Sequence, residues 1–246
     1  MWKRIAFYET ADNMINNHFD RIFVLNMPRS GKRRALFLFQ SKKLELANAE
    51  IIQAVDGRTL DLELMKAQGM LQWDKHLNRN LTAGEVGCYL SHVSAWRLLV
   101  ERRLKTALIC EDDILWKKDA NVIVDQFMTE VPGDWDIIHF HSHSPIGSGT
   151  HNDPGRKRVS NYVWEGYNEG RGSTCYAITA RGASFLLSIA FPIRSAVDGV
   201  TNWLTGWWKR CKGYRGYVCW PFPCEAGNTT SEIDAIVQRP EGQRTQ

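Results

Sequence analysis

Three adjacent carboxylates, Glu111, Asp112 and Asp113, directly follow the apolar run at residues 106–110. Such a run is typical of a short buried strand. Carboxylates at the edge of a core repel one another, and burial penalises their charged forms. A divalent cation would relieve both effects, and hard cations such as Mg²⁺ or Mn²⁺ prefer carboxylate oxygens. Ligands of open α/β sheets bind at the carboxyl ends of the strands, so the acidic run predicts a metal-assisted site. A solvated acidic turn is the alternative.

Backbone geometry separates the three carboxylates. In extended backbone, residues i and i+2 point to the same side, so Glu111 and Asp113 should converge while Asp112 points away. Asp113 is then the better metal ligand, and Glu111 or Asp112 is left to bind a sugar hydroxyl or the backbone. A nucleotide diphosphate with its cation needs few protein carboxylates, because phosphate oxygens and water complete the octahedron.

A basic segment follows the first predicted strand, residues 21–26, at the same edge of the sheet. It contains Arg29, Lys32, Arg33 and Arg34, and guanidinium groups bind phosphate through paired hydrogen bonds. The alternative is a solvated basic helix start. The chain has no G-x-x-x-x-G-K-[ST] loop and no G-x-G-x-x-G fingerprint, which argues against a P-loop NTPase and a dinucleotide-binding enzyme.

Three further features are candidates for chemistry. His139, His141 and His143 alternate, so they form either a zinc site or an exposed, pH-sensitive strand end. His92 lies beside the apolar stripe of a predicted helix, as a ligand contact, a proton carrier or a histidine bonded to a nearby carbonyl. Asp198 opens another predicted helix, where it is either an N-cap or a general base for an acceptor hydroxyl.

Strands and helices alternate along the chain, and they must position these residues. The strands are predicted at 21–26, 50–55, 106–110, 135–140, 173–179 and 214–220, and the helices at 35–46, 82–100, 119–130, 181–189 and 198–208. The helix from 82 begins with a capping box, Thr82 and Glu85. This order predicts an α/β fold with a mainly parallel sheet and helices on both faces. Residues 141–158 are predicted to form a loop that covers the site.

Length and composition limit the class of protein. A chain of 246 residues with 43% hydrophobic and 24% charged residues suits one α/β domain. A net charge of +4 is too small to indicate a nucleic-acid partner, and none is expected. The chain shows no signal peptide, no window long enough to span a bilayer and no C-x-x-C pair. We therefore expect a cytoplasmic protein with reduced cysteines.

Several segments resemble glycosyltransferase family 25, which includes lipooligosaccharide galactosyltransferases and collagen-modifying galactosyltransferases. Residues 81–92, LTAGEVGCYLSH, match the signature L-T-x-G-E-x-G-C-x-L-S-H at every fixed position. Other segments that resemble the family are its opening strand and basic turn (23–34), its second-strand exit (54–57), its acidic motif (107–114) and its acceptor-side segment (172–183 with 197–198). The resemblance covers residues 20–233, between an N-terminal extension (1–19) and a polar tail (234–246).

The resemblance implies a single-domain GT-A-type fold and an inverting transferase that moves galactose or glucose from a UDP-sugar to a glycan hydroxyl. It implies a role in lipopolysaccharide or other surface-glycan biosynthesis, and Mn²⁺ or Mg²⁺ held by Asp113 and Glu111. Asp198 falls where we place the general base. The residues expected to bind the nucleotide sugar are Asn26, Arg29, Arg33, Arg34, Glu85, His92, Glu111 and Asp112.

Two other classes of protein stay open. A metal-dependent phosphohydrolase would need a second cluster of ligands, for which residues 139–143 are the candidate. A binding module would use the aromatic and basic segment 207–217 to stack on carbohydrate or single-stranded nucleic acid. In an enzyme, the same segment could contact the inner face of a membrane, where a lipid-linked glycan is presented.

Overall fold

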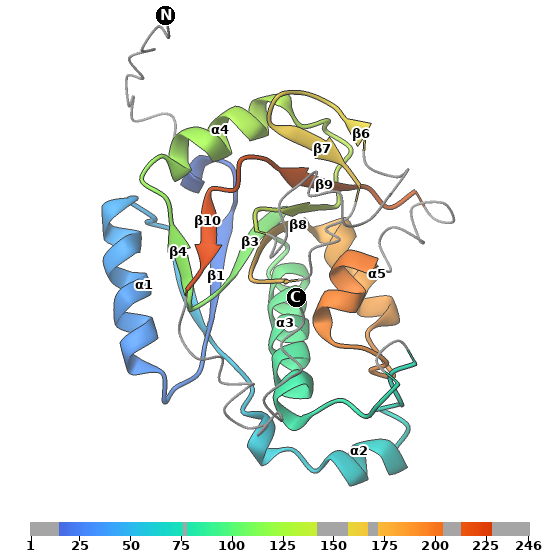
Figure 1. Cartoon of the computed structure of the whole chain (residues 1–246). Coiled ribbons are helices and arrows are strands. Elements are labelled where there is room, and N and C mark those ends of the chain that lie inside the picture. Colours follow the sequence, from blue (N-terminus) through green and yellow to red (C-terminus); the bar gives the residue numbers. More distant parts are fainter. Residues whose placement is uncertain (1–14, 76–77, 142–156, 167–171, 204–212, 228–246) are drawn as a thin grey trace, which may run out of the picture.

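An eight-stranded sheet forms the centre of the molecule, with helices on both of its faces (Figure 1). The computed structural model describes residues 15–75, 78–141, 157–166, 172–203 and 213–227. Its sheet contains β1 (Arg21–Asn26), β2 (Ala49–Gln53), β3 (Thr106–Glu111), β5 (Ile137–His139), β6 (Lys157–Arg158), β7 (Val163–Glu165), β8 (Cys175–Thr179) and β9 (Gly216–Cys219). Two short strands, β4 (Ile114–Trp116) and β10 (Cys224–Ala226), form a separate antiparallel pair.

Four of the five predicted helices occur as α-helices in the predicted order, and the described start of the fifth forms only a single turn. The α-helices are α1 (Gly31–Lys43), α2 (Leu62–Ala67), α3 (Ala83–Glu101), α4 (Ala120–Glu130) and α5 (Ala180–Ile189), and single turns occur at η1 (Ile15–Asn17), η2 (Gly57–Thr59) and η3 (Gly199–Trp203). Helix α1 begins four residues before its predicted start at Ala35, because Lys and Arg are good helix formers. The predicted basic turn is therefore in part the first turn of α1.

The sheet is mainly parallel, as predicted. Its strand order is β2-β1-β3-β8-β5-β9-β7-β6. Strands β8 and β7 run against their neighbours, and the pairings give the other six strands one common direction. The carboxyl ends of β1, β2 and β3 therefore lie at one edge, where the acidic run and the basic segment follow.

Alternating residues of the strands supply two hydrophobic layers, which confirms helices on both faces. In β1, Phe23 and Leu25 pack into the layer that contains residues of α3 and α5. Ile22 and Val24 pack into the layer that contains residues of α1 and α4. The period of two is that of any β-strand, and it places Glu111, two residues after Ile109, on the α3 side.

Parts of the predicted boundaries can be compared with the structure. Ile15 and Phe19, in the predicted N-terminal extension, are buried in the layer beside α4. Residues 142–156 of the predicted loop, 204–208 of the predicted last helix and the polar tail lie outside the described residues. The described cysteines are free thiols. Within the described residues, every helix is too short or too polar to cross a membrane.

Candidate functional site

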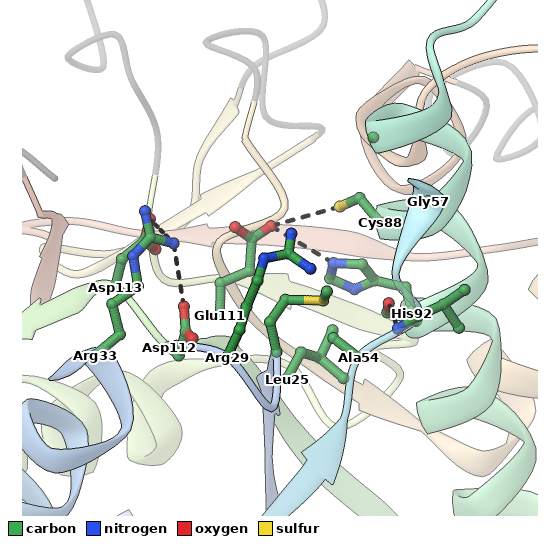
Figure 2. Close-up of a pocket in the computed structure, with 14 residues that line it drawn as sticks. Leu25, Arg29, Arg33, Ala54, Gly57, Cys88, His92, Glu111, Asp112 and Asp113 are labelled. Carbon is green, nitrogen blue, oxygen red and sulfur yellow. Dashed lines mark hydrogen bonds and ion pairs between the residues drawn. The ribbon is translucent and has the colours of Figure 1, made fainter. Parts of the chain in front are cut away.

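A cavity lies at the carboxyl ends of β1, β2 and β3 (Figure 2). Side chains from the exits of these three strands and from helices α1 and α3 meet there. The lining residues are Leu25, Met27, Arg29, Arg33, Ala54, Val55, Gly57, Gly84, Cys88, Ser91, His92, Glu111, Asp112 and Asp113. The position is the one that the strand-end argument predicts, and six of the predicted site residues line it.

The acidic run divides differently from the prediction. Extended backbone ends at Glu111, and Asp112 and Asp113 form a turn before β4. As a result, the Nη1 atom of Arg33 lies 3.3 Å from Asp112 Oδ1 and 3.4 Å from Asp113 Oδ2. Glu111 turns instead toward α3 and faces Cys88 and His92, away from Arg33 (Figure 2). The expectation that Asp112 points away from the other acidic groups is therefore wrong, because i, i+2 alternation does not continue through a turn.

Asp112 is the most buried of the three carboxylates. Its Oδ2 atom accepts a 2.6 Å hydrogen bond from the side-chain amide of Asn26, at the end of β1. Burial raises the pKa of Asp112, although the hydrogen bond from Asn26 and the charge of Arg33 act in the opposite direction. Asn26 thus takes part in the site by holding Asp112, beneath the cavity surface.

Asp113 has the electrostatic features of a cation ligand. Burial, followed by the negative charge of Glu111, raises the pKa of Asp113 to about 7. Its Oδ1 atom is buried and has no hydrogen-bond partner among the described residues. A buried carboxylate oxygen without a donor is unfavourable, and the contact with Arg33 is longer than a strong charged hydrogen bond. The donor set of Asp113 and Glu111 therefore fits a hard divalent cation.

Glu111 is connected to a buried hydrogen-bonded group on α3 and β8. The Cys88 thiol donates to Glu111 Oε1 at 3.9 Å, and His92 Nε2 lies 3.6 Å from the same oxygen. His92 Nδ1 lies 2.9 Å from the hydroxyl of Tyr176, which accepts a 2.9 Å hydrogen bond from Trp96. Burial raises the pKa of Tyr176 well above its usual value, so the hydroxyl keeps its proton. Donation to Nδ1 then places the His92 proton on Nε2, facing Glu111.

The twelve-residue signature holds α3 against the exit of β2. Ser91 Oγ accepts a 2.8 Å hydrogen bond from the backbone of Val55 and donates to the carbonyl of Gly87. A Cβ atom at Gly87 would lie 2.7 Å from the backbone nitrogen of Gly57. Glycine is therefore required for this close approach, which brings Cys88 and His92 to the cavity.

Three of the predicted donor-binding residues either pair with side chains outside the acidic run or lie outside the cavity lining. Arg29 lines the cavity and also pairs with Asp56. Arg34 is exposed on α1 and is not among the lining residues. Glu85, likewise outside the lining, completes the capping box with Thr82 and forms an ion pair with Arg79 at 2.6 Å. The structure thus brings Arg29 to the acidic run, but not Arg34 or Glu85.

Asp198, the predicted base, fixes the backbone before β8. Its carboxylate accepts hydrogen bonds from the backbone of Gly172 at 3.0 Å and Ser173 at 3.2 Å. The pKa of Cys88 is raised first by burial, then by the negative charge of Glu111 and then by that of Asp198. Asp198 is therefore within electrostatic reach of the cavity, although it does not line it.

The histidine run and the aromatic segment do not reach this cavity in the described residues. His139 is buried beside Tyr176, and His141 Nε2 accepts from the backbone of Ala226. Tyr214 and Tyr217, at the end of segment 207–217, are buried as well and cannot stack on a ligand. His143 and residues 207–212 lie outside the described residues. Among the residues that the structure describes, the one group of three potential metal-binding side chains is Cys88, His92 and Glu111. This group shares Glu111 with the acidic run.

Cys88 and Tyr176 are the residues that the site predictions missed. Cys88 stands in the signature, so its place on the α3 face toward Glu111 could have been inferred from its spacing of four from His92. Tyr176 gives no such signal, because an apolar strand with one tyrosine is typical of any core.

The chain matches the description Glycosyltransferase family 25 (LPS biosynthesis protein) over residues 19–201. Similar curated proteins include the mouse inactive glycosyltransferase 25 family member 3, with 35% identity over 49% of the chain, and procollagen galactosyltransferase 1 of Danio rerio, with the same identity and coverage. A glycosyltransferase 25 family member of Drosophila melanogaster is 32% identical over 69% of the chain. The chain covers 22%, 21% and 28% of these three proteins.

One solved structure that resembles the chain is a glycosyltransferase involved in the glycosylation of the major capsid of PBCV-1. It has 9% sequence identity and a TM-score of 0.37, over 69% of this chain and 66% of that chain. The family match covers most of the sequence and includes both the signature and the acidic run. The chain belongs to glycosyltransferase family 25.

Proposed function

We propose that the chain transfers a hexose, galactose or glucose, from a UDP-sugar to a hydroxyl of a glycan acceptor, with inversion at the anomeric carbon. The observation that carries this proposal is the cavity in which Glu111, Asp112 and Asp113 meet Arg29 and Arg33. Carboxylates beside guanidinium groups suit a diphosphate that enters with a cation. Family membership supports sugar transfer, and the galactosyltransferases among the relatives support galactose.

The cation that we propose is Mn²⁺ or Mg²⁺, held by Asp113 with Glu111. The orphaned Oδ1 atom of Asp113 and the raised pKa of its carboxyl support this choice. Such a cation would neutralise charge on the diphosphate when bound. Arg33, which the acidic groups already orient, would contact a phosphate oxygen, and Asp198 would accept the proton of the attacking hydroxyl.

The acceptor that we propose is a glycan or lipid-linked glycan of surface-polysaccharide biosynthesis, reached from the cytoplasmic side of a membrane. The family description, which names LPS biosynthesis, supports this class of acceptor. Because one of the similar proteins is described as inactive, turnover needs a direct test.

A donor screen by thermal unfolding tests the proposal. With Mn²⁺, a UDP-hexose at about a hundred times its Kd should stabilise the chain by about 2.7 kcal/mol. For a chain of this size that corresponds to a rise in Tm of roughly 5–10 °C. Asp113→Ala should abolish both this rise and sugar transfer. If no UDP-sugar raises Tm, or if Asp113→Ala transfers at the normal rate, the proposal is wrong; release of phosphate from simple esters would indicate a phosphohydrolase.

A further inference from the structure

Helix α1 exposes large apolar side chains that the cavity does not use. Leu36, Leu38 and Phe39 have exposed fractions of 37%, 48% and 58%. The helix packs on the sheet through Phe37 and Ser41, which are buried. Isolated exposed apolar residues are common, whereas Leu36 and Phe39, three residues apart on one face of the helix, form a patch that needs an explanation.

The same helix is strongly basic. Five of its thirteen residues are basic and none is acidic, which gives it a charge of +5 against +4 for the whole chain. One of the five, Arg33, contacts the acidic run. The other four are exposed: Lys32, Arg34, Lys42 and Lys43.

Two basic side chains flank two apolar side chains along one stripe. Lys32, Leu36, Phe39 and Lys43 are spaced i, i+4, i+7 and i+11, so they lie on one side of the helix. Lys43 Nζ lies 4.4 Å from the centroid of the Phe39 ring. Figure 1 shows α1 at the outer edge of the molecule, on the opposite face of the sheet from α3. We call these four residues the basic–apolar stripe.

We infer that the basic–apolar stripe binds the surface of an anionic phospholipid bilayer, with Leu36 and Phe39 inserted among the headgroups. A bilayer offers phosphates for the lysines and an acyl region for the apolar side chains at the same surface. A second copy of the chain would bring the same positive charge and be repelled, and a nucleic acid would leave Leu36 and Phe39 unused. The first turn of α1 carries Arg33, so docking would hold the cavity close to lipid-linked acceptors. The benefit of bringing the cavity close to acceptors rests on the proposed function, whereas membrane binding by α1 does not.

Vesicle sedimentation of the full chain, without donor or metal, tests the inference. Wild type should bind phosphatidylcholine vesicles that contain about a third phosphatidylglycerol, and binding should weaken with salt. Leu36→Ser/Phe39→Ser and Lys32→Gln/Lys43→Gln should each bind at least tenfold more weakly. Two matched pairs of exposed residues elsewhere should bind as wild type does: Leu64→Ser/Trp73→Ser and Lys105→Gln/Lys118→Gln.

Several outcomes would overturn the inference. These are absence of binding at low salt, equal weakening by the matched pairs, and a dimer that Leu36→Ser/Phe39→Ser dissociates. The inference would also be overturned if the chain bound a soluble polyanion but no vesicles, and if both double variants of α1 weakened this binding equally. Circular dichroism checks that each variant is folded. The donor-induced rise in Tm is measured separately, so failure to bind vesicles is distinguishable from failure to bind a UDP-sugar.

Discussion

Asn26 at the end of β1 and Asp112 after β3 are joined by a buried hydrogen bond of 2.6 Å. The two strands are parallel neighbours with Leu25 opposite Glu111, so Asn26 and Asp112 are the next pair along the register. The bond ties two strand exits together beneath the cavity. It also gives Asp112 a hydrogen-bond donor, which offsets part of the cost of burying its charged carboxylate.

Asn26→Leu should therefore destabilise the chain by about 1–3 kcal/mol, because a buried carboxylate loses a hydrogen-bond donor. The pKa of Asp112, already raised by burial, should rise further. Since a protonated Asp112 needs the donor less, the loss should shrink as the pH falls. Urea unfolding at neutral and acidic pH measures both effects, and an unchanged stability at neutral pH would contradict this account.

Much of the architecture was predictable from local patterns. Alternating apolar runs and helical stripes predicted the strands and helices, and the capping box marked the start of α3 within one residue. The position of the acidic run at a strand end follows from the apolar residues 107–110 that precede it. These signals are local, so the sequence carries them without knowledge of the fold.

Contacts between distant segments were not predictable in the same way. The 106–113 segment does not reveal that Asp112 and Asp113 turn toward Arg33, because turn geometry depends on what the next strand pairs with. Nothing near Glu85 indicates that Arg79, rather than a ligand, meets its carboxylate. Tyr176 contacts His92 only because β8 inserts antiparallel between β3 and β5.

Asp113→Asn should stabilise the metal-free chain at about pH 8 and abolish its stabilisation by Mn²⁺. The pKa of Asp113 is raised from 3.8 to about 7, so the folded state binds this proton more tightly than the unfolded chain does. Stability should therefore fall as the pH rises from about 4 to about 7, by at most about 4 kcal/mol. Asparagine removes this dependence. Urea unfolding across this range, with and without Mn²⁺, measures it.

The control for Asp113→Asn is Glu63→Gln, which removes a carboxylate that is 83% exposed. It should leave both the pH dependence and the Mn²⁺ effect intact. If Asp113→Asn is still stabilised by Mn²⁺ as strongly as wild type, the cation binds elsewhere.

Glu85→Gln should weaken folding without weakening donor binding. Burial alone would raise the pKa of Glu85, but the bonds from Arg79 and Thr82 outweigh it and lower the pKa. Its contribution to stability is therefore present above its usual pKa of 4.5 and lost as the pH falls through the lowered value. Glutamine preserves the capping box and loses the ion pair, so we expect a loss of about 1–3 kcal/mol at neutral pH. A smaller donor-induced rise in Tm with unchanged stability would instead support the predicted donor contact.

Asp198→Asn should retain donor binding and slow sugar transfer at least about a hundredfold, which is within the usual contribution of a general base. Asparagine cannot accept the hydroxyl proton, but its carbonyl oxygen can still accept one of the hydrogen bonds from Gly172 and Ser173.

Asp198 also holds this backbone in place, so slower transfer alone would not identify a base. Thr201→Val separates the two roles, because it removes the 2.6 Å hydroxyl contact with Ser173 and keeps the carboxylate. If Asp198 is the base, Thr201→Val should transfer at close to the normal rate, and Asp198→Asn should stay slow although it still binds the donor. Equal slowing by both variants, with donor binding kept, would mean that Asp198 acts by positioning the segment before β8.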